Sequence, residues 1–335
     1  MSAVANRGHR LHRLLINELA SAGCFKPALV RAVAYGAFVL GGYACAYVGL
    51  LTAPGWGLRV FCLAALAFLC VHAAFIAHEA GHGALTRDRR LAQAIGQVFN
   101  TLLTALCYSY FSHIHRLHHP HCNDRGRDPD MQSELFSLYA QSAAKKRGLG
   151  ALISRHQAVL IWILISLQGL TFKLDSLQYL RRNPRTTRVD QAVLALHAFL
   201  WLVPPTMVLG LGDALLNYAL MTWLIGPYTG AIFLVNHIGT RVIEPDEELP
   251  FFVQEIAVTR NLGSSRLQDF FFGGLNNHIE HHLFPSMPTA RLPEARRITR
   301  EFCQRHGIEY RETSWFRAAR DVAQHFRAMS ACVPR

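Results

Sequence analysis

Four long apolar segments constrain this chain of 335 residues more than any other feature, because each needs a lipid environment. Ala32–Ala53 and Ala214–Val235 carry no charged residue over 22 positions, and Val60–Ala77 carries none over 18. The fourth segment, Val189–Leu211, contains only Asp190. A helix of about 20 apolar residues crosses the hydrocarbon core of a bilayer. Since the remaining polar sequence is too short to cover four such helices in water, the sequence predicts an all-α integral membrane protein with four transmembrane helices.

The positive charge of the chain, a net +12, is distributed on one side of these segments. Cations precede the first segment, follow the second and precede the third: Arg7, Arg10, Arg13, Lys26, Arg31, Arg87, Arg89, Arg90, Arg181, Arg182, Arg185 and Arg188. The linkers Pro54–Gly57 and Gly212–Asp213 carry none. Because cytoplasmic loops are enriched in Lys and Arg, both termini and the central segment are predicted to be cytoplasmic.

Eight of the eighteen histidines lie in three short clusters. The first cluster is His78 and His82, the second is His115, His118 and His119, and the third is His278, His281 and His282. Positions i, i+3 and i+4 share one face of a helix, so each cluster aims its imidazoles in one direction. Eight imidazoles exceed the needs of one ion, and the pattern predicts a nitrogen-rich site for more than one metal. Imidazole binds zinc, copper, nickel and iron alike, so the ligand type does not select the metal.

A fifth apolar run, Ala158–Phe172, lies between the second and third clusters. If it crossed the bilayer, three crossings would separate those clusters and place them on opposite sides, which a single metal centre does not allow. The run is short, contains Gln168 and ends beside Lys173, so we interpret it as interfacial. Leu91–Phe111, which joins the first two clusters and contains three side-chain amides, is predicted to be interfacial for the same reason.

These features predict one membrane domain over residues 1–335. Its parts are a cytoplasmic N-terminal segment (1–31), a first span pair (32–77), a cytoplasmic and interfacial segment with the first two clusters (78–188), a second span pair (189–236) and a cytoplasmic segment with the third cluster (237–335). In the N-terminal segment, leucines at helical spacing predict a short helix lying in the membrane interface: Leu11, Leu14, Leu15 and Leu19. The eight cysteines form no CxxC pair, which indicates packing residues.

Two other functions share part of this pattern. His78-Glu-Ala-Gly-His82 matches the H-E-x-x-H motif of zinc metallopeptidases, but such a site needs only one further ligand and leaves the other two clusters unused. A metal transporter would hold its site near the bilayer midplane, whereas the clusters here flank the spans. The zinc intramembrane metallopeptidase and the metal transporter therefore stay distant alternatives. A carboxylate-rich di-iron bundle needs two Glu-x-x-His motifs, and the chain has only Glu79-x-x-His82.

The three clusters, their order and the span pair before the first resemble the membrane fatty acid desaturase family over roughly residues 30–325. The stretch Gly273–Pro288, GGLNNHIEHHLFPSMP, is especially similar to acyl desaturases, and Glu301–Tyr310 resembles the tail that follows it. The resemblance implies two iron ions held by about nine histidines, one of them between the second and third clusters. The candidate for that ninth ligand is His237, at the predicted cytoplasmic end of the fourth span.

The resemblance further implies an oxygen-dependent fatty acyl desaturase that introduces a double bond into a long acyl chain. Fatty acyl hydroxylases and acetylenases of the same superfamily use the same clusters and stay open as alternatives. Front-end desaturases usually begin the third cluster with Gln, where this chain has His278, so front-end regiochemistry is not assigned. Candidate residues around the ligands are Glu79, Asn236, Asn276, Asn277 and Glu280, together with Asp128, Asp130 and Asp269, whose carboxylates can accept the distal imidazole N–H.

The partners implied are membrane lipid and an external electron donor, with no role for nucleic acid. The chain contains no His-Pro-Gly-Gly haem segment, and the region before the first span is too short for a fused cytochrome, so we expect a separate ferredoxin or cytochrome b5-type donor. The substrate is expected on CoA, on acyl carrier protein or in a lipid, and a basic cytoplasmic face suits acidic donors and phosphates. His72 lies on another face of the helix that carries His78 and is expected to be packed or hydrogen-bonded.

Overall fold

The computed structural model of the chain describes residues 3–133 and 135–334, and the described part is built from helices. The longer helices are α1 (Ala3–Ser21), α2 (Leu29–Thr52), α3 (Trp56–Gly81), α5 (Tyr108–His121), α9 (Gln168–Arg182), α10 (Arg188–Leu209), α11 (Leu211–His237), α15 (Leu292–His306) and α16 (Trp315–Ser330). The shorter helices are α4 (Arg89–Gly96), α6 (Ala140–Lys145), α7 (Gly148–Arg155), α8 (Gln157–Leu164), α12 (Phe251–Val258), α13 (Arg266–Phe271) and α14 (His278–Leu283), with single turns η1 (Gln97–Leu102), η2 (Pro129–Met131), η3 (Ile165–Leu167) and η4 (Thr289–Arg291). Within the described residues, β pairing is limited to two isolated bridges. The predicted all-α class is confirmed.

Within the described residues, five helices are long and apolar enough to cross a membrane. Four of them, α2, α3, α10 and α11, contain the four apolar segments predicted from the sequence. The fifth is the continuous run α8–η3–α9, Gln157–Arg182, which includes the segment Ala158–Phe172. These five helices are identified as possible spans by their length and composition alone. The interfacial placement of Ala158–Phe172 therefore stays a prediction. The segment Leu91–Phe111 forms α4, the π-helical turn η1 and the start of α5 rather than one long helix.

The chain folds into two compact units. Unit 1 comprises residues up to 26, 114–164 and from 231 onwards, and unit 2 comprises residues 27–113 and 165–230. The second and third histidine clusters and His237 belong to unit 1, whereas the first cluster belongs to unit 2. The prediction of one membrane domain over the whole chain stays a prediction.

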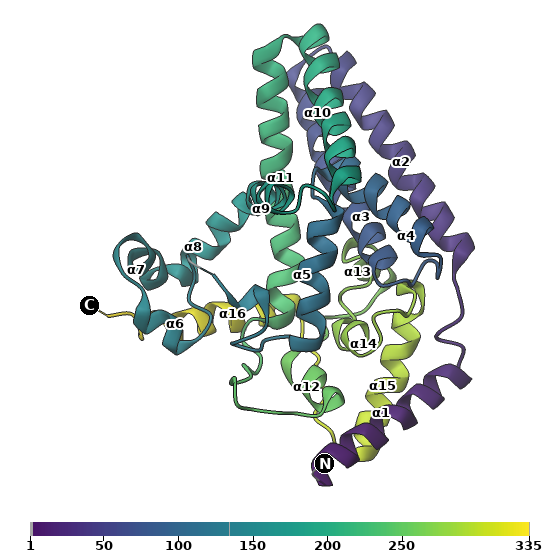
Figure 1. The fold of residues 1–335 in the computed structure, drawn as a ribbon, viewed down its shortest axis with the longest axis vertical. Coiled ribbons are helices and arrows are strands. Elements are labelled where there is room, and N and C mark those ends of the chain that lie inside the picture. Colours follow the sequence, from purple (N-terminus) through teal and green to yellow (C-terminus); the bar gives the residue numbers. More distant parts are fainter. Residues whose placement is uncertain (1–2, 134, 335) are drawn as a thin grey trace. The chain divides into compact units, whose positions relative to one another are not determined.

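Unit 2 is held together by close helix contacts. Helices α2 and α3 run side by side (Figure 1). Gly226 and Gly230, one turn apart on α11, face η3: a Cβ atom added at Gly226 would lie 2.4 Å from the carbonyl oxygen of Ile165. A Cβ atom at Gly169 would likewise lie 2.3 Å from the carbonyl oxygen of Thr222. Small residues let helix backbones approach in this way inside a membrane, where packing replaces the hydrophobic effect.

Unit 1 buries the apolar face of α1. Leu11, Leu15 and Leu19 are buried in a cluster that includes Phe252 of α12 and Phe302 of α15. Leu14, the remaining leucine of this pattern, is 43% exposed, and the interfacial placement of the helix stays a prediction. Helical spacing shows that a face is apolar but not what covers it.

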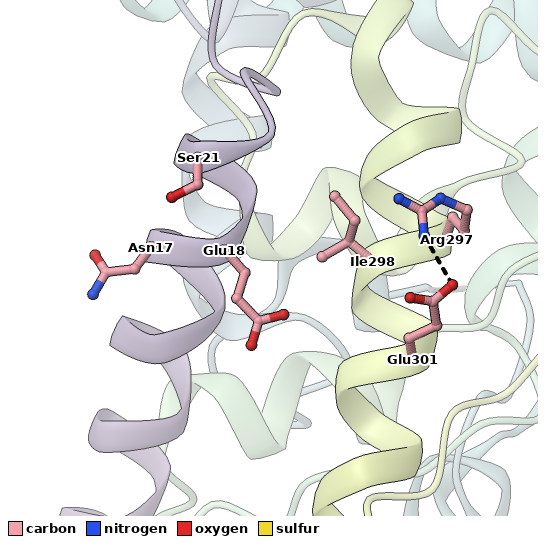
Figure 2. Close-up of a pocket in the computed structure, with 6 residues that line it drawn as sticks. All are labelled: Asn17, Glu18, Ser21, Arg297, Ile298 and Glu301. Atoms are coloured by element: carbon pink, nitrogen blue, oxygen red, sulfur yellow. Dashed lines mark hydrogen bonds and ion pairs between the residues drawn. The ribbon is translucent and has the colours of Figure 1, made fainter.

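A shallow pocket lies between α1 and α15 (Figure 2). Its lining is polar and comprises Asn17, Glu18, Ser21, Arg297, Ile298 and Glu301. Arg297 pairs with Glu301 at 2.9 Å and also with Glu294 at 2.6 Å. None of the six lining residues is a histidine, so this pocket is separate from the histidine clusters.

The close contact of Gly226 with the backbone of η3 predicts that a larger residue at this position lowers the stability of the protein. Replacing Gly226 by Ala places a methyl group against the backbone of η3, which cannot move aside as a flexible side chain can. We expect Gly226→Ala to destabilise the solubilised protein by about 1–3 kcal/mol, measured as a lower midpoint of thermal unfolding. The matched control is Gly212→Ala in the first turn of the same helix, where no atom lies within 4 Å of the added Cβ. That change should be neutral or slightly stabilising, and equal midpoints for the two variants would contradict the contact.

Candidate metal centre

Seven histidines gather in unit 1 from α5, α11 and α14. Because His115, His118 and His119 occupy positions i, i+3 and i+4 of α5, they point from one side of that helix. The ring nitrogens offered by His115, His119 and His281 all lie within 4.8 Å of one another, and we name these three residues the His115 group. The Nε2 atoms of His115 and His119 approach to 2.9 Å. The second and third clusters are therefore brought together by the fold.

A second group forms around His237, the last residue of α11. Ligand atoms of His118, His237, His282 and Cys122 lie within 4.8 Å of one another, and the Nε2 atom of His278 lies 2.7 Å from that of His237. We name His118, His237, His278 and His282 the His118 group. The ring centroids of His119 and His282 are 4.3 Å apart, so the two groups adjoin. His237 lies more than 35 residues from every cluster in the sequence, yet it lies among the third cluster in space.

The first cluster lies at the end of α3 in unit 2. His78 is buried, and its ring meets that of His82 nearly at right angles with centroids 4.8 Å apart. The spacing i, i+4 thus gives two imidazoles on one side of the helix, as the sequence predicted. The role of this pair as metal ligands stays a prediction.

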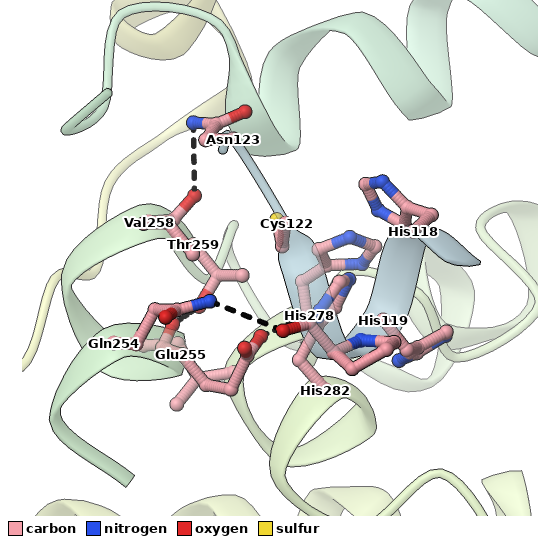
Figure 3. A network of polar contacts seen from close by, with 12 residues as sticks. His118, His119, Cys122, Asn123, Gln254, Glu255, Val258, Thr259, His278 and His282 are labelled. Atoms are coloured by element: carbon pink, nitrogen blue, oxygen red, sulfur yellow. Dashed lines mark hydrogen bonds and ion pairs between the residues drawn. The ribbon is translucent and has the colours of Figure 1, made fainter. Parts of the chain in front are cut away.

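Carboxylates orient two histidines of the His118 group. Asp128 lies 3.0 Å from Nδ1 of His118, and Asp130 lies 3.4 Å from the same atom. Glu255 of α12 lies 2.9 Å from Nδ1 of His282, and Figure 3 shows these two side chains next to each other. A carboxylate that accepts the Nδ1–H of an imidazole fixes its tautomer and leaves the Nε2 lone pair for a metal.

Backbone carbonyls orient the other two. Nδ1 of His237 lies 3.4 Å from the carbonyl oxygen of Val258, and Nδ1 of His278 lies 3.1 Å from that of Leu275. In the tautomers that donate both Nδ1–H groups to these carbonyls, the two Nε2 atoms present lone pairs to each other at 2.7 Å. A cation bound by both nitrogens satisfies these two acceptors. The donor set therefore fits a metal ion bound by imidazole nitrogen.

Burial and charge keep most of these imidazoles neutral. Burial lowers the pKa of His118, but the carboxylates of Asp130 and Asp128 outweigh it and raise the pKa to about 9. Burial, with the nearby charge of His118, lowers the pKa of His278 to about 3. Burial and the neighbouring imidazoles also lower the pKa of His282. Neutral imidazole is the form that binds a metal.

Cys122 lies among the nitrogen ligands. Its Sγ atom is 3.2 Å from Nδ1 of His237, on the side of that ring away from His278. Burial raises the pKa of the Cys122 thiol well above its ordinary value. This group of side chains therefore offers three imidazole nitrogens and one sulfur atom within 4.8 Å of one another.

Comparison with known proteins identifies the family. The sequence profile described as "Fatty acid desaturase" matches residues 54–314, which include all three clusters and His237. The chain belongs to the fatty acid desaturase family. It is therefore an oxidoreductase that desaturates fatty acids, as the resemblance noted in the sequence implied.

Individual relatives are distant from this desaturase. It is 25% identical over 328 residues to the Delta(8)-fatty-acid desaturase of Borago officinalis, covering 92% of this chain and 72% of that protein. It is 26% identical over 264 residues to the Acyl-lipid (9-3)-desaturase of Physcomitrium patens, covering 76% and 49%. It is 25% identical over 308 residues to the Delta(6)-fatty-acid desaturase fat-3 of Caenorhabditis elegans, covering 83% and 67%. The chain thus spans about half to three quarters of the length of these relatives.

Most of the other residues that were predicted near the ligands anchor the helix and the loop that carry the third cluster. The side-chain amide of Asn236 lies 3.3 Å from Nδ1 of His278. Glu280 accepts hydrogen bonds from Tyr310 and Asn261, at 2.7 and 2.8 Å, and so anchors α14 to its surroundings. Asn276 and Asn277 donate to Asp269, at 2.8 and 3.3 Å, and fix the loop before α14. Glu79 is half-buried on α3 in unit 2, and its role beside the first cluster stays a prediction.

Three residues around the ligands were missed by the sequence analysis. Glu255 is the only acid in the apolar helix Phe251–Val258, and a single carboxylate in such a segment was a signal that could have been used. Asn123 has a left-handed backbone, with φ 55°, and its amide donates to Thr240 Oγ1 and to the carbonyl of Arg241 at 2.9 and 3.0 Å. This bond ties the end of α5 to the segment after His237. Nothing in the sequence indicated Cys122.

The carboxylate contact predicts an effect on metal affinity. Asp128→Asn removes the anionic acceptor of the His118 Nδ1–H, and we expect metal affinity to fall by about 10–100-fold. Asp246→Asn is the control, since Asp246 is an exposed acid of the same unit. The measurement is iron binding by anaerobic titration, with the thermal midpoint of each apoprotein recorded alongside. An unchanged affinity in Asp128→Asn would show that Asp128 serves only its backbone contacts with Asn123 and Asp130.

Proposed function

We propose that this desaturase introduces a double bond into a long fatty acyl chain with two iron ions, O2 and electrons from a separate protein. The observation that carries the proposal is the pair of adjoining imidazole groups in unit 1, in which Nε2 lone pairs face each other while the outer ring nitrogens are held by carboxylates and carbonyls. Such an arrangement suits cations bound by nitrogen with positions left open for other ligands. A structural zinc site would need four ligands and no more.

Nine histidines are proposed as the iron ligands. They are His78, His82, His115, His118, His119, His237, His278, His281 and His282. When bound, the irons supply the activation of O2 that, with two electrons and two protons, removes two hydrogens from adjacent methylene groups and releases two waters. The chain's own residues hold the ligands and exclude bulk water.

Several side chains prepare the ligands for this task. Asp128 and Glu255 hold His118 and His282 in the tautomer that offers Nε2. Asn236 lies against His278, and Glu280 anchors the helix that carries the third cluster. Buried apolar residues on the same helix, Ile279 and Leu283, keep water from the ring nitrogens. Dry surroundings strengthen the metal–ligand interaction and limit side reactions of the oxidant.

The substrate carrier, electron donor and orientation follow from charge and from the relatives. Two kinds of relative, at 26% and 28% identity, are called acyl-lipid desaturases, which supports an acyl chain esterified in membrane lipid over acyl-CoA or acyl carrier protein. A ferredoxin or a cytochrome b5-type protein is the proposed donor, and the net charge of +12 suits an acidic partner. The one-sided arginines support an orientation with both termini and the metal centre on the cytoplasmic side.

The product test separates desaturation from related reactions. A host that expresses the chain should accumulate a fatty acid with one more double bond, seen when its lipids are converted to methyl esters and analysed by mass spectrometry. A host with the His281→Ala variant at equal expression is the control. A hydroxylated or acetylenic product would overturn the proposed reaction in favour of the corresponding enzymes of the same superfamily.

Metal content gives a direct prediction. Protein purified without chelators should contain about two irons per chain and little zinc, because nine imidazoles exceed the needs of one ion and the family implies iron. Elemental analysis by mass spectrometry measures both metals in one sample. A single zinc without iron would instead favour the metallopeptidase alternative built on His78, Glu79 and His82.

His237 and His72 offer a matched pair of substitutions. His237 lies among the ligands, whereas His72 of α3 is buried between two tyrosines: its Nδ1 lies 2.5 Å from Tyr35 Oη and its Nε2 lies 3.0 Å from Tyr228 Oη. The expectation that His72 is a hydrogen-bonded packing residue is confirmed. We expect His237→Ala to lower iron affinity and product formation more than about tenfold, while His72→Ala costs about 1–3 kcal/mol of stability.

The two variants are compared at equal amounts of folded protein. Iron content, product formation and thermal midpoint are measured for each. If His237→Ala kept full iron and turnover while His72→Ala lost both, the ninth ligand would have to be sought on α3 instead of α11.

A further inference from the structure

One stretch of unit 1 is basic and free of acids. Between Leu135 and Leu164 the sequence contains no Asp or Glu but contains Lys145, Lys146, Arg147 and Arg155. The stretch forms α6, α7 and α8, and Lys145, Arg147 and Arg155 are exposed. Four cations without a compensating acid over 30 residues form a local excess of positive charge, which lies outside the metal centre.

The same short helices expose large apolar side chains. Leu149 and Leu152, three residues apart on α7, are 68% and 52% exposed. Val159 and Ile163, four residues apart on α8, are 64% and 61% exposed. These spacings place each pair on one side of its helix. Contiguous apolar exposure of this kind marks a surface that contacts a partner or a lipid.

Cations and apolar groups meet in one hollow, where the start of α8 lies against the end of α16. The hollow is lined by Arg155, His156, Ala158, Val159, Leu160, Arg327 and Ser330. Among the described ion pairs none involves Arg155 or Arg327, and Arg155 donates only to the backbone carbonyl of Pro334. Two guanidinium groups that form no ion pair with a described carboxylate therefore line the same hollow as apolar Val159.

We propose that this surface, made of Leu149, Leu152, Arg155, Val159, Ile163 and Arg327 and named the α7–α8 surface, binds an anionic phospholipid of the membrane in which the protein resides. The guanidinium groups of Arg155 and Arg327 contact the lipid phosphate in the hollow. The four apolar side chains enter the boundary between head groups and acyl chains.

Charge and apolarity together favour lipid over other occupants. Clusters of Lys and Arg beside membrane segments attract anionic lipids, and arginine binds phosphate with two parallel hydrogen bonds. An interfacial helix combines such cations with exposed leucines and aromatic residues, and Trp162 on α8 adds an aromatic side chain of the kind enriched at that depth. The assignment holds whether the run Gln157–Arg182 crosses the bilayer or lies on it, since in both cases α7 and the start of α8 lie outside the hydrocarbon core. It does not depend on the proposed reaction.

The first experiment measures lipid selectivity. The full chain is placed in nanodiscs of phosphatidylcholine with or without phosphatidylglycerol, and retained lipids are counted by native mass spectrometry. We expect wild type to retain phosphatidylglycerol preferentially and the double variant Arg155→Gln, Arg327→Gln to lose that preference by about tenfold or more. The control is Arg300→Gln, Arg305→Gln on α15, which removes the same charge from exposed positions of the same unit.

Three outcomes would overturn the proposal. Wild type could show no preference for phosphatidylglycerol. Both double variants could lose the preference equally, which would show that only the net charge of the protein matters. Inorganic phosphate added to phosphatidylcholine nanodiscs could raise the thermal midpoint as much as phosphatidylglycerol does, which would make the ligand a free anion. Equal midpoints of wild type and both variants in phosphatidylcholine alone establish that all three are folded before the lipids are compared.

The second experiment measures depth and separates lipid from an acidic protein partner. A fluorophore attached at Val159→Cys, in a background where exposed Cys45 and Cys332 are replaced by Ser, is exposed to lipids with brominated acyl chains. We expect strong quenching at this position and weak quenching for the same fluorophore at Arg300→Cys. A probe at Val159→Cys that stays unquenched and accessible to aqueous iodide would show a surface facing water, and the lipid assignment would be wrong.

Discussion

The buried imidazoles impose the requirement on which the rest of unit 1 depends. A neutral imidazole has one donor and one acceptor, and leaving either unsatisfied in an apolar interior is costly. The fold satisfies the donors of His118 and His282 with Asp128 and Glu255, and that of His237 with the carbonyl of Val258. The acceptors are left to converge on one another. A cation bound among them would satisfy them together, and for this reason the donor set fits a metal ion.

This requirement explains the tight anchoring of elements that are weak by themselves. Helix α14 has only six residues, and a helix of that length is not stable alone. Its position is set by buried bonds from its neighbours: Asn261 accepts the backbone N–H of Ile279 at 2.8 Å, and Tyr310 reaches Glu280. Asn123 likewise anchors the end of α5 to the segment after α11, through its hydrogen bonds to Thr240 and Arg241. The ligands are thus held by polar contacts to loops, while apolar packing of α1, α12 and α15 supplies the surrounding stability.

The spans and the histidine clusters were predictable because each depends on local sequence. Uninterrupted apolar segments gave α2, α3, α10 and α11 within a few residues of their observed ends. Helical spacing gave the shared face of each histidine cluster. The burial of Leu11, Leu15 and Leu19 of α1 was not predictable, since leucine spacing describes an amphipathic face equally well for lipid and for protein. What covers such a face depends on residues about 240 and 290 positions away, around Phe252 and Phe302.

The sequence by itself determined that the chain is a helical membrane protein, that its histidines lie in three clusters of helical spacing and that these clusters resemble those of fatty acid desaturases. Tertiary structure alone decided that His237 meets His278, that Glu255 lies beside His282 and that Cys122 lies beside His237. The physical reason is the distance along the chain over which each kind of interaction acts. Hydropathy and helical spacing act over a few turns of one helix, whereas the orientation of a buried ring nitrogen is set by acceptors from other helices, whose meeting follows only from the packing of the whole unit.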